Sequence, residues 1–184
     1  MDKVPPSDDA AATGARRTEA SRGPRILGPG DGRAVDFGSF GVRFMVWGEE
    51  SGGGFSLVEH PIPPRTLVAP LHRHTNEDEY SYVLEGHMGA RLGEEVVYAE
   101  KGDLVFKPRG QWHTFWNAGE EPCRILEIIS PGGFEHLFRE MADDPEAMAG
   151  DTAAALDARY GLEVDPDSVP GLCAEHGLVF PVEG

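Results

Sequence analysis

Two histidines and a glutamate lie close together in HRHTNEDEYSYVLEG, residues 72–86. A β-strand turns residues i and i+2 to the same face, so His72 and His74 can point together, about 6 to 7 Å apart along the strand. Imidazole nitrogens and carboxylate oxygens are ligands that transition-metal ions accept. The spacing therefore indicates a metal site that Glu79 would complete.

Glu79 can join the two histidines only if the strand breaks between them. Five positions separate His74 from Glu79, and this odd number would turn the carboxylate to the opposite face of an unbroken strand. Residues 75–78 are polar and turn-prone, which suits a bulge or a short loop that resets the register. After the break, alternation places two side chains on the face of Glu79 and three on an apolar outer face: Ser81 and Val83, and Tyr80, Tyr82 and Leu84.

A third histidine follows a turn in GDLVFKPRGQWHTFWN, residues 102–117. Pro108 and Gly110 suit a tight turn, after which His113 opens another strand. Further along, Glu127 interrupts the apolar stretch ILEII. A buried carboxylate there would have a perturbed pKa and could serve as a second acid or base, although the sequence does not say which face it occupies.

Composition limits the classes of partner. The 184 residues are 40% apolar, enough for one domain with a core, and no apolar run reaches the roughly 18 residues of a membrane span. Acidic residues outnumber basic ones 32 to 16, so the chain would repel nucleic acid and anionic membranes. No apolar stretch follows Arg16 and Arg17, as a translocation signal would need. We expect a cytoplasmic protein whose partners are a small molecule and no nucleic acid or membrane.

The chain divides into three parts. Residues 1–25 contain few apolar residues and predict a disordered leader. Residues 26–133 hold short apolar stretches between glycine, proline and acidic turns, which favours an antiparallel sandwich or barrel. Residues 134–184 predict a helical tail with short helices at 151–160 and 168–176. Its first apolar stripe has helical spacing: Phe134, Leu137, Phe138 and Met141.

The two stretches together resemble a known family. The first resembles the first cupin motif, HxHx(3,4)Ex(6)G, through His72, His74, Glu79 and Gly86. The second resembles the second cupin motif, Gx(5)PxGx(2)Hx(3)N, through Gly102, Pro108, Gly110, His113 and Asn117. The first motif usually opens with a glycine where this chain has Thr66. The resemblance is to a single-domain metal-binding cupin, with flavonol-cleaving dioxygenases among its relatives. It implies an all-β fold, the double-stranded β-helix or jelly roll, around a ligand cavity.

The resemblance implies one divalent transition-metal ion, Fe, Mn, Ni, Co or Zn, held by His72, His74, Glu79 and His113. A six-coordinate ion with these ligands would keep two positions open, whereas tetrahedral zinc would keep none. One anionic ligand leaves the site a formal charge of +1, which favours a substrate oxygen that becomes an enolate or phenolate. In the flavonol-cleaving relatives the equivalent glutamate is also a base, so the resemblance permits that catalytic role for Glu79.

Three functions remain open. The first is a dioxygenase-type oxidoreductase that acts on a small substrate with an acidic hydroxyl or carbonyl group. The second is a metal-dependent isomerase, cyclase or decarboxylase, and the third is a non-catalytic binder of a small molecule or metal. The fold does not choose among them. Five side chains are expected either to line the substrate pocket or to fill the core: Val83, Met88, Ala90, Phe106 and Phe115. The apolar outer face needs a helix or a second subunit to cover it, and we expect a homodimer.

Overall fold

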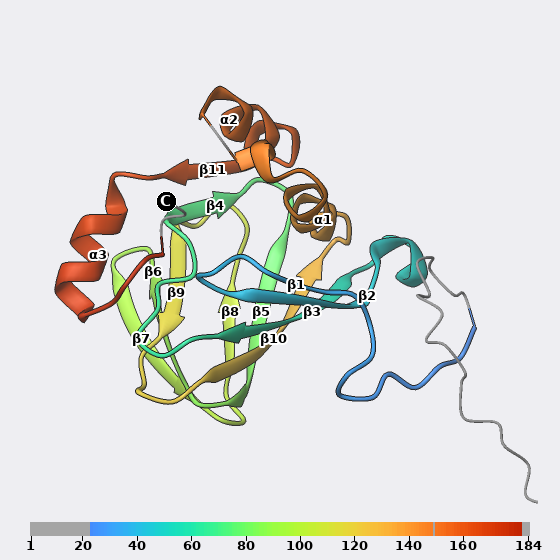
Figure 1. Ribbon diagram of the computed structural model, residues 1–184, viewed down its shortest axis with the longest axis horizontal. Coiled ribbons are helices and arrows are strands. Elements are labelled where there is room, and N and C mark those ends of the chain that lie inside the picture. The colour runs from blue at the N-terminus through green and yellow to red at the C-terminus, as the bar shows by residue number, and fades with distance from the viewer. Residues whose placement is uncertain (1–22, 149, 182–184) are drawn as a thin grey trace, which may run out of the picture.

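A computed structural model describes residues 23–148 and 150–181 of the chain. Two sheets face each other as a barrel, with helices at one end and along one side (Figure 1). The described part of the chain forms a six-stranded sheet in the order β1-β2-β3-β10-β5-β8 and a five-stranded sheet in the order β11-β4-β9-β6-β7. The strands are β1 (Ala34–Asp36), β2 (Gly41–Val46), β3 (Ser56–Ile62), β4 (Leu71–His74), β5 (Asp78–Glu85), β6 (His87–Leu92), β7 (Glu95–Glu100), β8 (Leu104–Lys107), β9 (His113–Asn117), β10 (Cys123–Ser130) and β11 (Leu162–Asp165).

Strand alternation directs side chains into the barrel. Along β10 every second side chain is buried, and the residues between are only partly covered. The buried set consists of Cys123, Ile125, Glu127 and Ile129. Three of these four are apolar and belong to the main core between the sheets, so the fourth, a carboxylate, is held on the inner face by the same periodicity.

The expected break before Glu79 is a crossing between the two sheets. β4 ends at His74 in the five-stranded sheet, and β5 begins at Asp78 in the six-stranded sheet. Glu79 therefore faces the histidines from the opposite wall, which a bulge within one strand would not achieve. The second stretch crosses in the same way, since β8 lies in the six-stranded sheet and β9 in the five-stranded sheet.

The two crossings are tied together. The backbone N–H of Gly110 donates to the carbonyl oxygen of His74 at 2.7 Å. Arg109 forms an ion pair with Asp78, with 2.8 Å between Nη2 and Oδ2. Gly110 has a φ of 76°, a left-handed conformation that favours glycine. These contacts fix the first ligand strand relative to the turn before His113.

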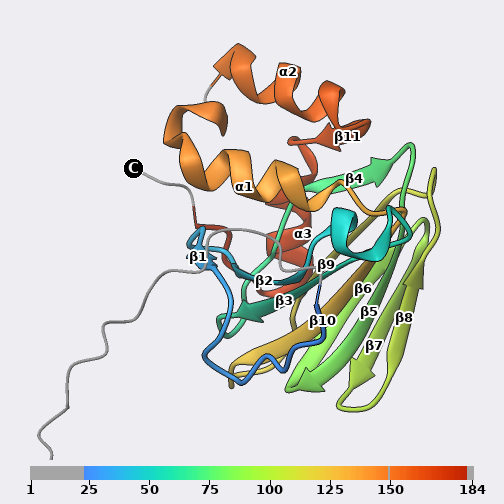
Figure 2. The ribbon, with the colours of Figure 1, turned by 90° about the vertical axis from the view of Figure 1, so that its right-hand side faces the viewer.

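The tail contains one strand in addition to its helices. It comprises α1 (Glu135–Asp143), the short 3₁₀-helix η2 (Pro145–Met148), α2 (Gly150–Arg159), β11 and α3 (Ser168–His176). Figure 2 shows α1 and α2 over one end of the barrel. β11 pairs with β4, and Val164 lies opposite His72. The expectation of a helical tail is corrected here, because Leu162 and Val164 alternate in a strand that extends the sheet holding His72, His74 and His113.

The leader was expected to end at residue 25, and residues 1–22 lie outside the described part of the chain. Arg25 is already attached to the barrel. Its guanidinium donates to the Glu50 carboxylate at 2.7 Å and to the Met45 carbonyl oxygen at 2.8 Å. Glu50 belongs to η1 (Gly48–Ser51), another 3₁₀-helix. The packed part of the chain therefore begins before residue 26.

The predicted fold class is confirmed: the chain is mostly β and forms a double-stranded β-helix with a short helical tail. α3 spans the predicted residues and packs Leu172 against Trp116 on the outer side of β9. None of the helices in the described ranges has the length and apolar character needed to cross a membrane.

Candidate metal centre

Four side chains from three strands converge inside the barrel. His72 and His74 come from β4, His113 opens β9 and pairs with His72 across the strands, and Glu79 approaches from β5. All four are buried, and one potential ligand atom from each lies within 4.8 Å of the others. The structure thus brings together the four residues that the sequence indicated as ligands.

Backbone carbonyl groups set the protonation of two imidazoles. His72 Nδ1 lies 2.8 Å from the Pro70 carbonyl oxygen, and His113 Nδ1 lies 3.0 Å from that of Gln111. A carbonyl oxygen only accepts, so Nδ1 donates in both rings. A neutral imidazole then has its lone pair on Nε2. Both rings therefore present an unprotonated nitrogen for a ligand bond, held by an outer hydrogen bond as is usual for metal-binding histidines.

The geometry around His74 and Glu79 fits a metal ion. Neither ring nitrogen of His74 has a hydrogen-bond partner among the described residues, although both are buried. Glu79 Oε1 lies 3.3 Å from His74 Nε2, and Glu79 Oε2 lies 3.2 Å from His113 Nε2. Two atoms bound at right angles to one ion, each about 2.1 Å from it, are about 3 Å apart. The orphaned imidazole and these separations are what a four-ligand site requires.

The tail covers this centre. The Phe134 ring meets the His74 ring edge to face, with centroids 4.3 Å apart, and it also contacts Phe138 of α1. Phe134 is buried. Apolar contacts on one side of the cluster limit the access of water, which strengthens electrostatic interactions inside the barrel. The sequence predicted the apolar stripe that includes Phe134 but not that it packs on His74.

A buried lysine shares the interior with the cluster. Lys107 is fully buried on β8, and its Nζ lies 2.8 Å from Glu79 Oε2 and 3.1 Å from Glu127 Oε2. It also lies 4.3 Å from the centre of the Phe115 ring. Sequence reasoning missed Lys107. The signal was the alternation of LVFK, in which Val105 and Lys107 share one face of the strand.

Burial and neighbouring charges shift the ionisation of the cluster. Burial disfavours ionised Glu79, but the Lys107 ammonium and the imidazoles of His74 and His113 outweigh it and hold the pKa of Glu79 well below its usual value. Burial, with His113 and His74 close by, lowers the pKa of His72 well below its usual value. Burial also lowers the pKa of His113, against the opposing effect of Glu79. Unprotonated imidazoles and an ionised carboxylate are the forms that bind a metal.

Glu127 occupies the inner face, which the sequence left open. Its Oε2 accepts hydrogen bonds from Ser81 Oγ at 2.7 Å and from Lys107 Nζ at 3.1 Å. Burial raises the pKa of Glu127 to about 7, with a further rise from nearby Glu79 and an opposing effect of Lys107. The Lys107 ammonium therefore links Glu79 of the cluster to Glu127, a carboxyl group with a higher pKa.

The expected pocket residues separate into two groups. Four of them are buried in the core between the sheets: Val83, Met88, Ala90 and Phe115. Phe106 is 47% exposed and stacks on Tyr80 on the outer side of β5 and β8. The expectation that Phe106 lines the interior is therefore corrected. Its neighbour Lys107 takes the inner position because two carboxylates bind its ammonium there.

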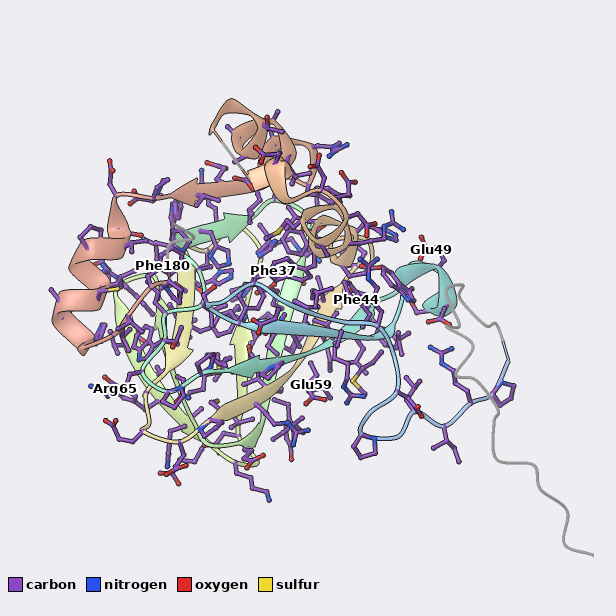
Figure 3. All side chains as sticks on the ribbon, in the orientation of Figure 1. Phe37, Phe44, Glu49, Glu59, Arg65 and Phe180 are labelled. Atoms are coloured by element: carbon purple, nitrogen blue, oxygen red, sulfur yellow. The ribbon has the colours of Figure 1, made fainter. Side chains whose placement is uncertain are left out.

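A second group of possible ligands consists of Glu49, Glu135 and His136. Figure 3 shows Glu49 beside the η1 turn, away from the barrel interior. Both oxygens of Glu135 accept backbone N–H groups at 2.7 Å, Oε1 from Gly48 and Oε2 from Gly133. His136 Nε2 contacts Glu49 Oε1 at 2.7 Å. These contacts explain the group as a clamp between η1 and α1.

Comparison with known proteins places this site in a family context. Residues 59–129 match the family described as Cupin domain. This segment includes all four cluster residues, Lys107 and Glu127. The match supports the cupin superfamily for the barrel, as the motifs had indicated. The polyketide cyclase RemF from Streptomyces resistomycificus has a similar fold, with a TM-score of 0.51, 24% identity and coverage of 58% of this chain and 79% of that chain.

Two curated proteins are similar over part of their length. The tetracenomycin polyketide synthase protein TcmJ of Streptomyces glaucescens is 38% identical over 60 residues, which is 33% of this chain and 40% of that protein. Oxidoreductase iacF of Pestalotiopsis fici is 32% identical over 93 residues, which is 43% of this chain and 46% of that protein. The chain thus spans less than half the length of either relative.

Proposed function

We propose that the protein is a metal-dependent enzyme that closes a ring in a small polyketide-like substrate through its enolisable carbonyl groups. The observation that carries this proposal is the buried cluster of His72, His74, Glu79 and His113, whose ligand atoms lie within 4.8 Å of one another. A divalent ion held there would supply Lewis-acid chemistry to a substrate oxygen. The TcmJ and RemF names, a polyketide synthase protein and a polyketide cyclase, support the substrate class.

The chain's own residues favour a substrate that develops negative charge on oxygen. Lys107 brings a positive charge into a fully buried position beside Glu79. Its ammonium stabilises a nearby oxyanion strongly because the surroundings contain little water. Glu79, with a lowered pKa, is a weak base, which supports its role as a ligand more than a role as the base.

A dioxygenase is the second candidate function. The oxidoreductase name of iacF supports it, and so does the number of ligands, because a six-coordinate ion with four protein ligands has room for both a substrate and dioxygen. This reaction would use the same enolate-forming or phenolic substrates. Oxygen consumption separates it from ring closure.

Turnover of a linear triketone tests the proposal. Purified protein, with its metal content measured, is incubated with heptanetrione, and products are analysed with and without dioxygen. Ring closure by aldol condensation gives methylresorcinol and water, and we expect it at the same rate in both atmospheres. Product formed only with stoichiometric oxygen uptake would favour the dioxygenase. Bound metal without turnover of the triketone would contradict the cyclase proposal and favour a binding protein.

A further inference from the structure

One carboxylate oxygen of Glu127 has no hydrogen-bond partner among the described residues. Its side chain is 1% exposed, and within the described part of the chain Oε1 has no hydrogen-bond partner, while Oε2 accepts from both Ser81 and Lys107. A buried polar atom without a partner destabilises a fold by about 1 to 3 kcal/mol. Such an atom in a folded protein calls for an explanation, of which a ligand contact is one.

The two donors determine where a proton on Glu127 resides. Ser81 Oγ and Lys107 Nζ both approach Oε2, and an oxygen that accepts from two donors is the poorer place for a hydrogen. A protonated carboxyl group has a single O–H. The proton therefore resides on Oε1, the oxygen that has no partner among the described residues, and it is available to an acceptor inside the barrel.

We propose that Glu127 is the proton donor to the substrate, delivering its proton from Oε1 to a carbonyl oxygen. This inference rests on the proposed ring closure. In that step the enol carbon bonds to the carbonyl carbon, the π electrons move to the carbonyl oxygen, and this oxygen takes the proton of Glu127. The enol hydroxyl becomes a ketone, and its proton returns to the Glu127 carboxylate. No proton is gained or lost overall.

The surroundings of Glu127 suit this role. Across β5 it pairs with Ser81, and across β3 it pairs with Val58, which is apolar. The charged groups that face it are Lys107 from β8 and Glu79 from β5. Its pKa of about 7 keeps a proton available near neutral pH, and a general acid is most effective when its pKa lies close to the working pH.

Infrared difference spectroscopy tests whether Oε1 carries the proton. Spectra of the full-length, nickel-loaded protein are compared on either side of neutral pH. We expect the carbonyl band of a protonated carboxyl group, lowered in frequency by the two hydrogen bonds that Oε2 accepts, and we expect Glu127→Gln to abolish it. Glu135→Gln is the matched control, since Glu135 is equally buried but both of its oxygens are bonded to backbone N–H groups.

A second variant keeps the test decisive if Glu127→Gln does not fold. Ser81→Ala retains the carboxyl group and removes one hydrogen bond that favours its ionised form. The band should then persist to higher pH than in the parent. A band that is absent from the parent, that survives Glu127→Gln, or that titrates unchanged in Ser81→Ala would overturn the inference.

Acetylacetone shows whether the proton reaches a ligand. It has the β-dicarbonyl unit of the proposed substrate and cannot close a ring on itself. When it binds to the nickel-loaded protein, a hydrogen bond from Oε1 should move the Glu127 band to lower frequency. If ultraviolet absorbance shows that acetylacetone is bound but the band does not move, the role of Glu127 alone is overturned. Absence of binding at saturating nickel would overturn both this role and the proposed substrate class.

The rate of ring closure measures how much Glu127 contributes to the reaction. A general acid typically accelerates a reaction about 100-fold to 10,000-fold, so Glu127→Gln should slow closure of heptanetrione by at least about 100-fold. Its metal content should equal that of the parent, because Glu127 is not one of the four cluster residues. A merely structural role would instead reduce metal content or melting temperature along with the rate. Full activity of Glu127→Gln would overturn the inference.

Discussion

The inner and outer faces of β5 and β8 depart from the usual distribution of polar and apolar side chains. Beside Val83 and Val105, the inner face buries three polar or charged groups: Glu79, Ser81 and Lys107. The outer face exposes aromatic and aliphatic ones: Tyr82, Leu104 and Phe106. In an ordinary two-sided sheet the polar side chains would point to solvent and the apolar ones to the core. This departure supports the proposed site inside the barrel and the proposed partner on its outer face.

The two faces differ in what holds them. Buried charges are stable only when each has a partner, because desolvation costs several kcal/mol per ion. Lys107 satisfies this condition through two carboxylates and the Phe115 ring. On the outer face, Tyr80 and Phe106 stack with ring centroids 4.8 Å apart, and no charge has to be neutralised. Substitutions should therefore be severe inside and mild outside.

Removing the buried ammonium should have the largest effect on stability. Lys107→Met leaves the Glu79 and Glu127 carboxyl groups without their shared cation, and breaking a buried pair in this way typically costs about 3 to 5 kcal/mol. Urea unfolding would measure the change. Adding Glu127→Gln to Lys107→Met should restore part of the loss.

Lys101→Met is the matched control, because Lys101 is exposed in the turn before β8. Its effect should stay within about 0.5 kcal/mol. Equal losses for Lys107→Met and Lys101→Met would contradict the claim that the inner ion pairs hold this part of the barrel together.

Substitution of the proposed ligands should have the next largest effect, a loss of metal affinity. Loss of an outer-shell partner typically weakens metal binding about 10-fold to 100-fold, so His113→Ala, which removes a proposed ligand, should exceed this range. Glu79→Gln should retain a weaker three-histidine site. Competition with a chromogenic chelator would measure both. Glu95→Gln is the control, since Glu95 is exposed on β7 and outside the cluster. If all three variants bind as tightly as the parent, the proposed ligand set is wrong.

The sequence was sufficient for the cluster because its information is local. Strand alternation explains why His72 and His74 point together, and the odd spacing to Glu79 required a break in the strand. That the break is a crossing between sheets depends on which strands pair, which one segment does not reveal. β11 was missed for the same reason, since Leu162 and Val164 make a strand only when β4 is beside them.

Side-chain polarity misled the assignment of β8. Hydrophobicity alone places Phe106 inside and Lys107 outside. The structure does the opposite because Glu79 and Glu127, from two other strands, provide partners for a buried ammonium. In the sequence Lys107 lies 28 positions after Glu79 and 20 positions before Glu127. The pairing of a buried ammonium with these carboxylates can be recognised only when it is known that the three strands lie side by side.

Acid should destabilise the barrel interior next, where His60 of β3 is buried as well as the histidines of the cluster. Burial lowers the pKa of His60 to about 4, and also lowers those of His72 and His113. In the unfolded chain each histidine has a pKa of about 6.5. Below that pH the unfolded chain binds protons that the folded chain does not, so the free energy of unfolding falls as pH decreases towards about 4. The slope should approach about 1.4 kcal/mol per pH unit for each of these three histidines. The raised pKa of Glu127 offsets one such contribution, because the folded chain binds that proton more tightly than the unfolded chain does.

Urea unfolding at a series of pH values, with a chelator present to remove the contribution of metal, would measure this slope. His60→Gln should reduce the slope by the contribution of one histidine. His87→Gln should leave it unchanged, because His87 is exposed. A free energy of unfolding that stays constant between neutral pH and about pH 5 would contradict the buried, neutral state of these rings.

The outer face should give the smallest change in the fold and the clearest change in assembly. Within the described sheets β8 is an edge strand, and an edge with exposed apolar side chains is a place where another chain can pair. We propose that a second copy covers it in a symmetric homodimer. Phe106→Ser should shift the protein from dimer to monomer in light scattering, with unchanged metal content. Tyr98→Ser, exposed on the opposite edge strand β7, should remain dimeric. A parent protein that is monomeric at every concentration would remove the need for a partner on this face.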